Sequence, residues 1–389
     1  MPGGLTVVVL NWQRPGLIDR ALRALERQSD PDFDVIVVSD VAPAPDWAVR
    51  VRWLTTESPG VAAARNLALA QPGEEIVAFL DDDAVPHPGW VAALRSAFGP
   101  RTVAAGGPVL GPDGVRLQWG RLWVNRCGEE GAERPGAVLK LNGTNMALRR
   151  SAVEAAGGFN PAFAYYLDDT DMVLRLSDLG AIAWVPDAVV QHGTEANGVR
   201  ARAGVPTAMT PLLDSLGTFL DIHAPGERDA ALDRFRDHQR ARIRRAYGAG
   251  DLREGTVARL MSELDEAPRP PRGPPPSPNL QAHPPSAFGA KPPARSVILV
   301  PDILSRAAAR RDAATKAAAA DVRLLEMRIS PRRLVVRFTA EGWWYHLGGA
   351  YERPQSWRTA VARELERMLA ERPAQEILRY RRGRRVGGP

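Results

Sequence analysis

The hydrophobic residues in the N-terminal half of the chain fall into two kinds of segment. Short unbroken apolar runs are typical of strands covered on both faces, and apolar residues recurring every third or fourth position are typical of helices. The predicted strands cover residues 5–10, 35–38, 51–54, 76–80 and 103–107, and the predicted helices cover residues 17–28, 60–70 and 90–98. Strands that alternate with helices predict an α/β fold with a doubly wound, mostly parallel sheet.

The same pattern continues more loosely up to residue 192. The sequence predicts a turn and a strand within 140–149, a short helix at 152–156, a helix over 172–179, and two apolar runs at 182–186 and 188–192. Residues 86–89, which contain Pro86 and Pro88, are predicted to exclude regular structure.

Composition divides the chain into four predicted parts. Residues 1–210 form the α/β domain, and residues 211–266 form an amphipathic helical extension with a basic face. Residues 267–294 contain 11 prolines in 28 positions, which predicts a semi-rigid linker. Residues 295–389 are predicted to form a small α+β domain, with strands at 297–300, 324–329, 334–338 and 343–347, helices at 304–320 and 357–369, and a basic tail from 379. The strands 324–329 and 334–338 are expected to pair as a hairpin.

Charge is distributed unevenly along the chain. The formal net charge is +6, yet residues 1–266 carry 28 Lys and Arg against 35 Asp and Glu, whereas residues 295–389 carry 20 against 10. The basic C-terminal region has three interpretations: peripheral contact with an anionic membrane, binding of an acidic polysaccharide or protein, or a solvated surface. Nucleic acid is disfavoured as a partner because the basic residues are not interleaved with aromatic residues in a known module.

Cysteine usage and hydropathy limit the compartment. Cys127 is the only cysteine, which excludes a disulfide within the chain and a cysteine zinc site and fits a reducing compartment. The first residues carry no basic segment followed by an apolar stretch, so no signal peptide is predicted. No run approaches the roughly 18 apolar residues of a membrane span. The expected location is cytoplasmic, soluble or peripheral at the inner face of a membrane.

Three consecutive carboxylates, Asp81, Asp82 and Asp83, follow the apolar run 76–80 directly. A buried strand that ends in charge delivers that charge to the carboxyl edge of the sheet, where open α/β sheets bind ligands. Adjacent carboxylates repel one another unless a cation neutralises them. The pattern therefore favours a metal or metal–phosphate site over an ordinary polar loop.

A second acidic cluster lies at residues 168–171, before a predicted helix. The helix dipole favours acidic residues at this position, which accounts for one or two of the three acids. The remaining carboxylate can supply a general base. His192 follows the last apolar run, where it can complete the coordination of a metal or serve as an ordinary surface residue.

Two common nucleotide-binding folds are excluded or disfavoured. No GxxxxGK[ST] motif is present, which excludes a P-loop, and the first strand–helix turn, residues 11–15, is not glycine-rich, which weighs against a dinucleotide fold. A metal-bound diphosphate leaving group with a carboxylate base is an apparatus for transferring a group from a nucleotide-activated donor.

The order of these motifs over residues 5–195 resembles glycosyltransferase family 2, whose members have the GT-A fold and invert configuration while using nucleotide-sugar donors. The matching segments are VVVLNWQRPGLIDRALRALERQ, DVIVVSD, GVAAARNLAL, FLDDDAVPHPGW, NGTNMALRRSAVEAAGGFNPAF and LDDTDMVLRLSDLG. The second strand ends in Ser-Asp, where many relatives have Asp-Asp-Gly-Ser, and Asp168 stands where glutamate is commoner.

The resemblance implies a role for each matching residue. Asp169 would be the catalytic base, and a divalent Mn²⁺ or Mg²⁺ ion would be bound by Asp83 and His192. The acceptor side would include Asn145, Asp168 and Asp171. The donor nucleotide and sugar would be contacted by Asn11, Arg14, Asp40, Arg65, Asp81 and Asp82.

The expected function is therefore a metal-dependent inverting glycosyltransferase. It would move a sugar from a nucleotide-diphosphate donor to a hydroxyl of a glycan or lipid-linked glycan, as in polysaccharide biosynthesis. Two alternatives stay open: a nucleotidyltransferase that uses the acidic clusters for metals, and a non-catalytic scaffold that acts through its basic C-terminal domain.

Overall fold

The computed structural model describes most of the N-terminal two thirds of the protein and the strands of its C-terminal part. The described residues are 4–12, 14–48, 50–56, 60–163, 165–193, 195, 205–270, 281–283, 288, 295–301, 322–328, 335–338, 344–347, 376–381 and 384–386. The helices predicted at 304–320 and 357–369 lie outside these residues.

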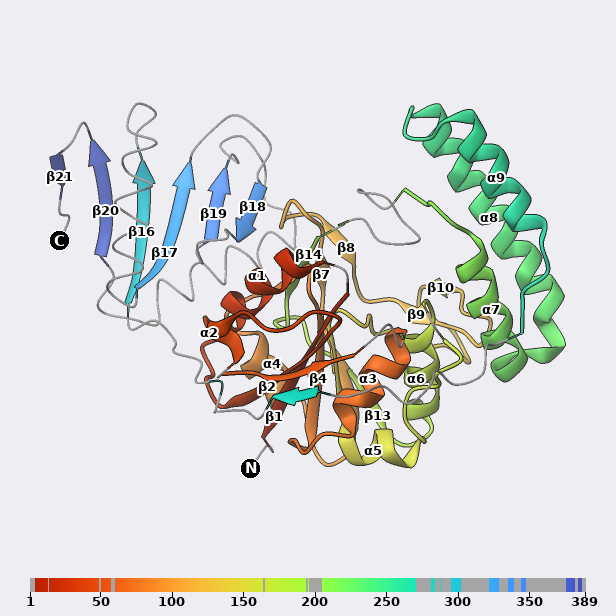
Figure 1. The fold of residues 1–389 in the computed structure, drawn as a ribbon, viewed down its shortest axis with the longest axis horizontal. Helices are drawn as coiled ribbons and strands as arrows, with labels where there is room; N and C mark the ends of the chain where they lie inside the picture. Colours follow the sequence, from red (N-terminus) through yellow and green to blue (C-terminus); the bar gives the residue numbers. More distant parts are fainter. Residues whose placement is uncertain are drawn as a thin grey trace.

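A large sheet forms the centre of the N-terminal part (Figure 1). Its strands, in spatial order, are β13 (Ala181–Trp184), β6 (Thr102–Gly106), β12 (Met146–Arg149), β4 (Ile76–Asp81), β1 (Leu5–Asn11), β2 (Phe33–Ser39), β3 (Arg52–Thr55) and β15 (Gln281–His283). Strands β4, β1, β2 and β3 are parallel, whereas β12 and β15 are antiparallel to their neighbours. The predicted α/β class with a mostly parallel sheet is confirmed.

Helices cover both faces of this sheet, as a doubly wound fold requires. Along β1, Val7 and Val9 belong to one core cluster and Val8 to the other, because successive strand residues point to opposite faces. The first cluster includes residues of α1 (Pro15–Leu25), α2 (Pro45–Ala48) and α4 (Trp90–Ser96), and the second includes residues of α3 (Val61–Leu69), α5 (Arg150–Ala155) and α6 (Asp168–Ser177). The sequence pattern did not predict the short helix α2.

Two smaller sheets adjoin the carboxyl edge of the large sheet. The first has the order β5 (Ala84–Pro86), β14 (Val190–His192), β7 (Val109–Leu110) and β8 (Leu117–Trp119). The second has the order β10 (Glu130–Gly131), β9 (Trp123–Val124) and β11 (Val138–Leu139). The prediction that Pro86 lies outside regular structure is wrong. Pro86 pairs with Val190 on an edge strand, where a residue without an N–H group leaves no inner partner unsatisfied.

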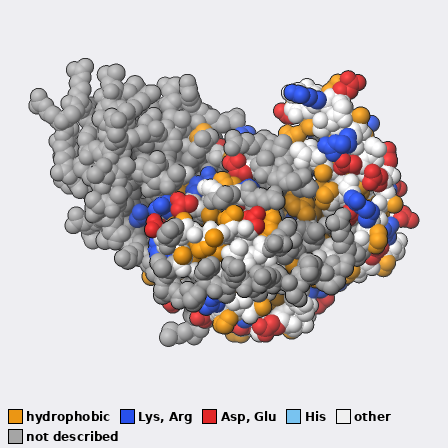
Figure 2. Space-filling model, in the orientation of Figure 1, with side chains coloured by type: hydrophobic (Ala, Val, Ile, Leu, Met, Phe, Trp, Pro, Cys, Tyr) orange, Lys and Arg blue, Asp and Glu red, His pale blue; other side chains and the backbone are white. Residues whose placement is uncertain are grey.

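Residues 210–265 form three helices, α7 (Thr210–His223), α8 (Arg228–Gly248) and α9 (Glu254–Asp265). Side chains of both charges cover α8 and α9 (Figure 2). Part of the basic face expected here is paired with acids: Arg234 pairs with Glu129, Arg236 with Asp233, and Arg240 with Asp237 and Asp265. Among the helices that are described, none combines the length and hydropathy needed to cross a bilayer.

The proline-rich stretch does more than connect two parts of the chain. Its strand β15 pairs with β3 at the edge of the large sheet. Phe288 is buried, and its ring centre lies 5.4 Å from that of Phe33. Arg50 donates a hydrogen bond to the carbonyl of Phe288. This stretch therefore anchors itself to the α/β domain by strand pairing and by a buried aromatic ring.

The C-terminal strands form a six-stranded sheet. Its order is β18 (Val335–Phe338), β19 (Trp344–Leu347), β17 (Val322–Arg328), β16 (Arg295–Pro301), β20 (Glu376–Arg381) and β21 (Arg384–Val386). The predicted hairpin between 324–329 and 334–338 is wrong, because β19 lies between β17 and β18. A short turn permits local pairing but does not exclude a later strand from the central position. The basic tail predicted from residue 379 contains the second half of β20 and all of β21 instead.

Candidate active site

The candidate site lies at the point where the order in which strands are added to the sheet reverses direction. From β1 the chain builds outward to β2 and β3, and then continues with β4 on the other side of β1. The carboxyl ends of β1 and β4 are therefore adjacent, and open α/β sheets bind ligands at such a switch point. Asn11 ends β1, and Asp81 ends β4. The side-chain amide of Asn11 donates a 2.6 Å hydrogen bond to Asp82.

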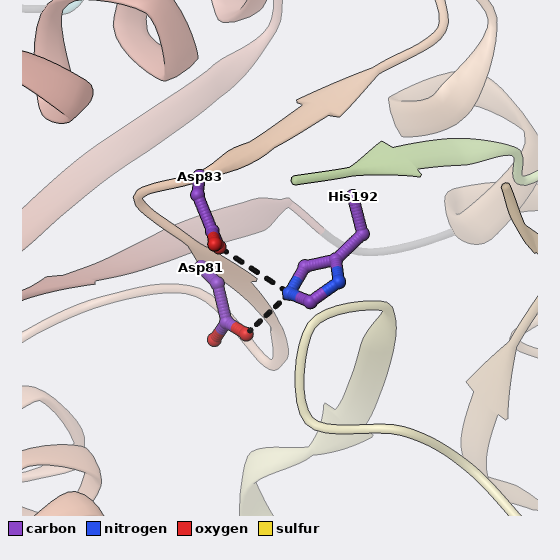
Figure 3. Close-up of side chains that lie close together, drawn as sticks. All are labelled: Asp81, Asp83 and His192. Atoms are coloured by element: carbon purple, nitrogen blue, oxygen red, sulfur yellow. Dashed lines mark ion pairs between the residues drawn. The ribbon is translucent and has the colours of Figure 1, made fainter. Parts of the chain in front are cut away.

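Asp81, Asp83 and His192 converge at this edge (Figure 3). The His192 Nε2 atom lies 3.6 Å from Asp81 Oδ2 and 3.3 Å from Asp83 Oδ1. One candidate ligand atom from each of the three side chains lies within 4.8 Å of the others. Two carboxylates and an imidazole are a donor set suited to a divalent ion such as Mn²⁺. These residues fit a metal. Asp81 ends β4, Asp83 lies between β4 and β5, and His192 ends β14.

His192 is held in the orientation that a metal ligand needs. Its Nδ1 atom lies 3.2 Å from Gln118 Oε1, and its ring centre lies 5.3 Å from that of Trp119. When Nδ1 carries the proton and donates to Gln118, deprotonated Nε2 can give its lone pair to a metal ion held beside the two acids. Burial lowers the pKa of His192, but hydrogen bonding to Asp81 and Asp83 outweighs burial and raises the pKa to about 9.

Replacing Gln118 by leucine is expected to weaken metal binding about 10-fold, because hydrogen-bond partners behind a ligand fix its tautomer and ring orientation. Titration with Mn²⁺ by electron paramagnetic resonance measures the effect. Gln71→Leu is the matched control, since Gln71 precedes β4 at the opposite edge of the sheet and its side-chain amide donates only to the carbonyl of Leu67 among its described contacts. Equal Mn²⁺ affinity in the wild type and Gln118→Leu would contradict this role.

The middle acid of the triplet, Asp82, contacts Arg14 and Asn11. Asp82 is fully buried and pairs with Arg14 at 2.5 Å, while Arg14 also lies 3.3 Å from Asp83. Ser39, at the end of β2, donates a hydrogen bond to Asn11. Burial raises the pKa of Asp82 to about 7, against the lowering effect of Arg14. These contacts lock the ends of β1, β2 and β4 together.

The second group is built around Asp169 in the first turn of α6. Asp169 accepts hydrogen bonds from the backbone N–H of Gly143 at 2.9 Å and from the N–H and hydroxyl of Thr170. Burial opposes the ionised form, but Lys140, Arg65 and these hydrogen bonds outweigh it and lower the pKa of Asp169. Asp169 is therefore an ionised, half-buried carboxylate, the state required of a general base.

Backbone strain accompanies this carboxylate. Tyr166 has φ of 100° and Leu167 has φ of 66°, and they are the only non-glycine residues with positive φ in the described part of the chain. Such conformations cost about 1–3 kcal/mol each and cluster at functional sites. The strain lies immediately before α6, where it sets the direction from which Asp168 and Asp169 enter the site.

Arg65 interacts electrostatically with both groups. It forms a buried ion pair with Asp168, and its guanidinium carbon lies 5.4 Å from the Phe79 ring centre and 5.2 Å from that of Phe159. Burial lowers the pKa of Arg65, and the charges of Asp169 and Asp81 oppose that shift. One guanidinium is thus within electrostatic reach of both the metal group and the base.

Replacing Arg65 by methionine is expected to destabilise the fold by about 3 kcal/mol, because Asp168 would be left buried without its partner. Urea denaturation measures the loss. The double variant Arg65→Met with Asp168→Asn is expected to recover part of this loss, since it removes the uncompensated charge. If the double variant were less stable than Arg65→Met, the ion pair would not be the cause.

Comparison with known proteins gives a match to a protein family. Residues 6–157 match the family model described as glycosyl transferase family 2. Residues 6–157 form a glycosyl transferase family 2 domain. The match includes β1 from its second residue, the three acids at the end of β4 and the strand β12.

Two curated relatives share part of this region. The chain is 33% identical over 147 residues to the pre-mycofactocin glycosyltransferase of Mycobacterium tuberculosis, covering 35% of this chain and 30% of that protein. It is 29% identical over 112 residues to the glucosyl-dolichyl phosphate glucuronosyltransferase of Haloferax volcanii, covering 27% of this chain and 36% of that protein. The chain thus spans about a third of the length of the relatives it matches.

Two solved structures share part of the fold. The structure of GalNAc-T7 with UDP, GalNAc and Mn²⁺ has a TM-score of 0.44 at 13% identity, covering 56% of this chain and 48% of that one. The mannosyltransferase PcManGT of Pyrobaculum calidifontis, in complex with GDP-Man and Mn²⁺, has a TM-score of 0.42 at 19% identity, covering 67% and 79%. These similarities are partial and concern the fold alone.

Several further predicted site residues have structural partners. Asn145 is buried, accepts a hydrogen bond from Trp90 and donates to the carbonyls of Pro108 and Ala188. Asp171 is buried and pairs with Arg175 at 2.5 Å and with His223 of α7 at 2.9 Å. Asp40 follows β2, half-buried, beside the end of β1. The acceptor role of Asn145 and Asp171 and the nucleotide role of Asp40 stay predictions.

The sequence interpretation missed two residues of this site. Gln118 orients His192, and Lys140 is buried beside Asp169 with its ammonium 3.1 Å from Glu130. Burial lowers the pKa of Lys140, but Asp169 and Glu130 outweigh it and raise that pKa. Lys140 stands two residues before the motif NGTN, and a lone basic residue ahead of a polar turn was the only signal available.

Proposed function

We propose that the protein is a metal-dependent inverting glycosyltransferase that moves a sugar from a nucleotide-diphosphate donor to an acceptor hydroxyl. The observation that carries the proposal is the presence of two chemically distinct groups at one sheet edge. Asp81, Asp83 and His192 offer a set of metal ligands, and Asp169 offers an ionised base. Arg65 interacts electrostatically with both groups, which supports their proximity.

Each residue has a task in this proposal. Asp81, Asp83 and His192 hold the divalent ion, which when bound supplies the positive charge that neutralises a diphosphate leaving group. Asp169 accepts the proton of the acceptor hydroxyl as that oxygen bonds to the anomeric carbon. The bond between the anomeric carbon and the diphosphate oxygen breaks on the opposite face, so the configuration inverts without an enzyme nucleophile.

The acceptor is proposed to be a glycan or lipid-linked glycan. Two relatives are named for transfer to different acceptors, one related to mycofactocin and one to a dolichyl phosphate. Both names describe transfer of a sugar, which supports the proposed reaction class. The two acceptors differ from each other.

Product analysis tests the reaction class. The protein is incubated with Mn²⁺ and nucleotide sugars that each stabilise it in a thermal-shift screen, where a donor at 100 times its Kd should add about 2.7 kcal/mol. Release of a nucleoside diphosphate with the sugar on the acceptor is expected. Pyrophosphate release would instead indicate the nucleotidyltransferase, and failure to bind any nucleotide sugar or metal would indicate a scaffold.

A further inference from the structure

One surface segment physically connects the two groups of the candidate site. Residues 117–124, called here the bridging segment, contain β8 and β9. This segment lies outside the motifs that suggested the function, and its two tryptophans had no assigned role. Its contacts at either end give it one.

The first end of the bridging segment adjoins the metal group. Gln118 lies 3.2 Å from the Nδ1 atom of His192, and the Trp119 ring centre lies 5.3 Å from the imidazole centre. Strand β8 pairs with β7, and β7 pairs in turn with β14, which carries His192. A ligand beside the proposed metal would therefore meet Trp119.

The second end adjoins the base. The carbonyl of Leu122 accepts a 2.8 Å hydrogen bond from the backbone N–H of Lys140, and Trp123 pairs with Leu139 of β11. The chain then leads from Lys140 to Gly143, whose N–H donates to Asp169. An acceptor whose hydroxyl reaches Asp169 beside the metal group would lie along the bridging segment.

The bridging segment presents aromatic surface to solvent. Trp119 and Trp123 are half-buried, whereas Val124, which follows Trp123 on β9, is 1% exposed. Alternation along β9 therefore directs Val124 inward and Trp123 outward. The exposed Arg121 lies with its guanidinium carbon 4.9 Å from the Trp123 ring centre. Tryptophan has an apolar face, and the arginine beside it carries several N–H donors.

We propose that the bridging segment is the acceptor platform, and that Trp119 and Trp123 select an acceptor that presents a pyranose ring. This inference rests on the proposed glycosyltransferase function. One face of a pyranose carries C–H groups that pack on an indole, and its rim carries hydroxyl groups. Those hydroxyls can bond to Arg121 and to the nearby pair of Lys140 and Glu130.

The charges around the platform argue against an alkyl chain as its occupant. Arg121 and Glu130, which are both exposed, would lose water to a hydrocarbon chain without gaining a hydrogen bond, which is costly. A saccharide offers a hydroxyl for each polar group it covers. The part of the acceptor next to the transferred sugar is therefore a sugar ring, whatever is attached beyond it.

Saturation-transfer NMR with the full-length protein tests the proposal. The probes are the methyl glycosides of glucose, galactose, mannose and N-acetylglucosamine, each with Mg²⁺ and either UDP or GDP. At least one glycoside is expected to bind, with contact through its ring protons. Trp119→Leu and Trp123→Leu should each weaken that binding about 2- to 10-fold, and the phenylalanine variants should retain most of it, because phenylalanine keeps an aromatic face.

Leu179→Ala is the control for loss of an exposed apolar side chain, since Leu179 is 49% exposed after α6. The proposal is overturned if no methyl glycoside binds, whether or not 1-octanol does, or if the leucine variants bind glycoside as the wild type does. It is also overturned if Trp119→Leu weakens the binding of a nucleotide sugar but not the binding of its nucleoside diphosphate. That result would mean that Trp119 contacts the donor sugar.

A failure of the proposed glycosyltransferase function would give a different experimental result. Its failure would appear as absent binding of metal and nucleotide in the wild type, measured by Mn²⁺ titration and by thermal shift with UDP and GDP. Failure of the platform would leave metal and nucleotide binding intact and remove only the dependence of glycoside binding on the tryptophans.

Discussion

Replacing Asp169 by asparagine is expected to lower the rate of sugar transfer about 100- to 10,000-fold, the usual contribution of a positioned base. Asparagine has nearly the same shape, and its amide oxygen can still accept the hydrogen bond that Gly143 donates to Asp169. It cannot accept the proton of the acceptor hydroxyl. The Kd values of metal and nucleotide should therefore change little, whereas kcat should fall.

Steady-state kinetics and calorimetric binding separate these two quantities. Asp178→Asn is the matched control, since Asp178 caps the other end of α6 and is exposed. Near-normal turnover of Asp169→Asn would show that another residue is the catalytic base. A parallel loss of nucleotide affinity would mean that Asp169 supports the site structurally.

Removing the metal is expected to abolish transfer, and Asp83→Asn should weaken Mn²⁺ binding by about 100-fold or more, because a neutral amide binds a divalent ion less well than a carboxylate. Asp83 is the more informative of the outer acids, since it is 1% exposed and lies 3.3 Å from His192. A mobile surface carboxylate cannot readily replace it.

Activity is measured after dialysis against EDTA and after adding back Mn²⁺ or Mg²⁺, and affinity is measured by Mn²⁺ titration. Asp187→Asn, at an exposed position between β13 and β14, controls for the loss of one negative charge. Full activity in EDTA would show that sugar transfer does not require the metal. Normal Mn²⁺ affinity of Asp83→Asn would place the ion elsewhere.

Much of the fold followed from local patterns. The apolar runs that became β1, β2 and β4 are buried on both faces, so their composition alone identified them as central strands. Pairings between distant segments did not follow. Strand β15 and Phe288 come from a proline-rich stretch whose composition predicted a linker, and they pack on β3 and Phe33. The C-terminal hairpin failed for the same reason, because β19 competes with β17 for β18.

The sequence by itself determined which side chains stand at the strand ends: Asp81 and Asp83 after one apolar run, His192 after another, and Asp169 at a helix start. Only the tertiary structure decided how they are held. The hydrogen-bond partner of His192 is Gln118, 74 positions earlier, and the cation beside Asp169 is Lys140. Residue type and local periodicity reveal a buried strand and the charge that ends it. Orientation and electrostatics depend on neighbours that only the folded chain brings together, since hydrogen bonds and charge interactions act over a few ångströms of space and not along the sequence.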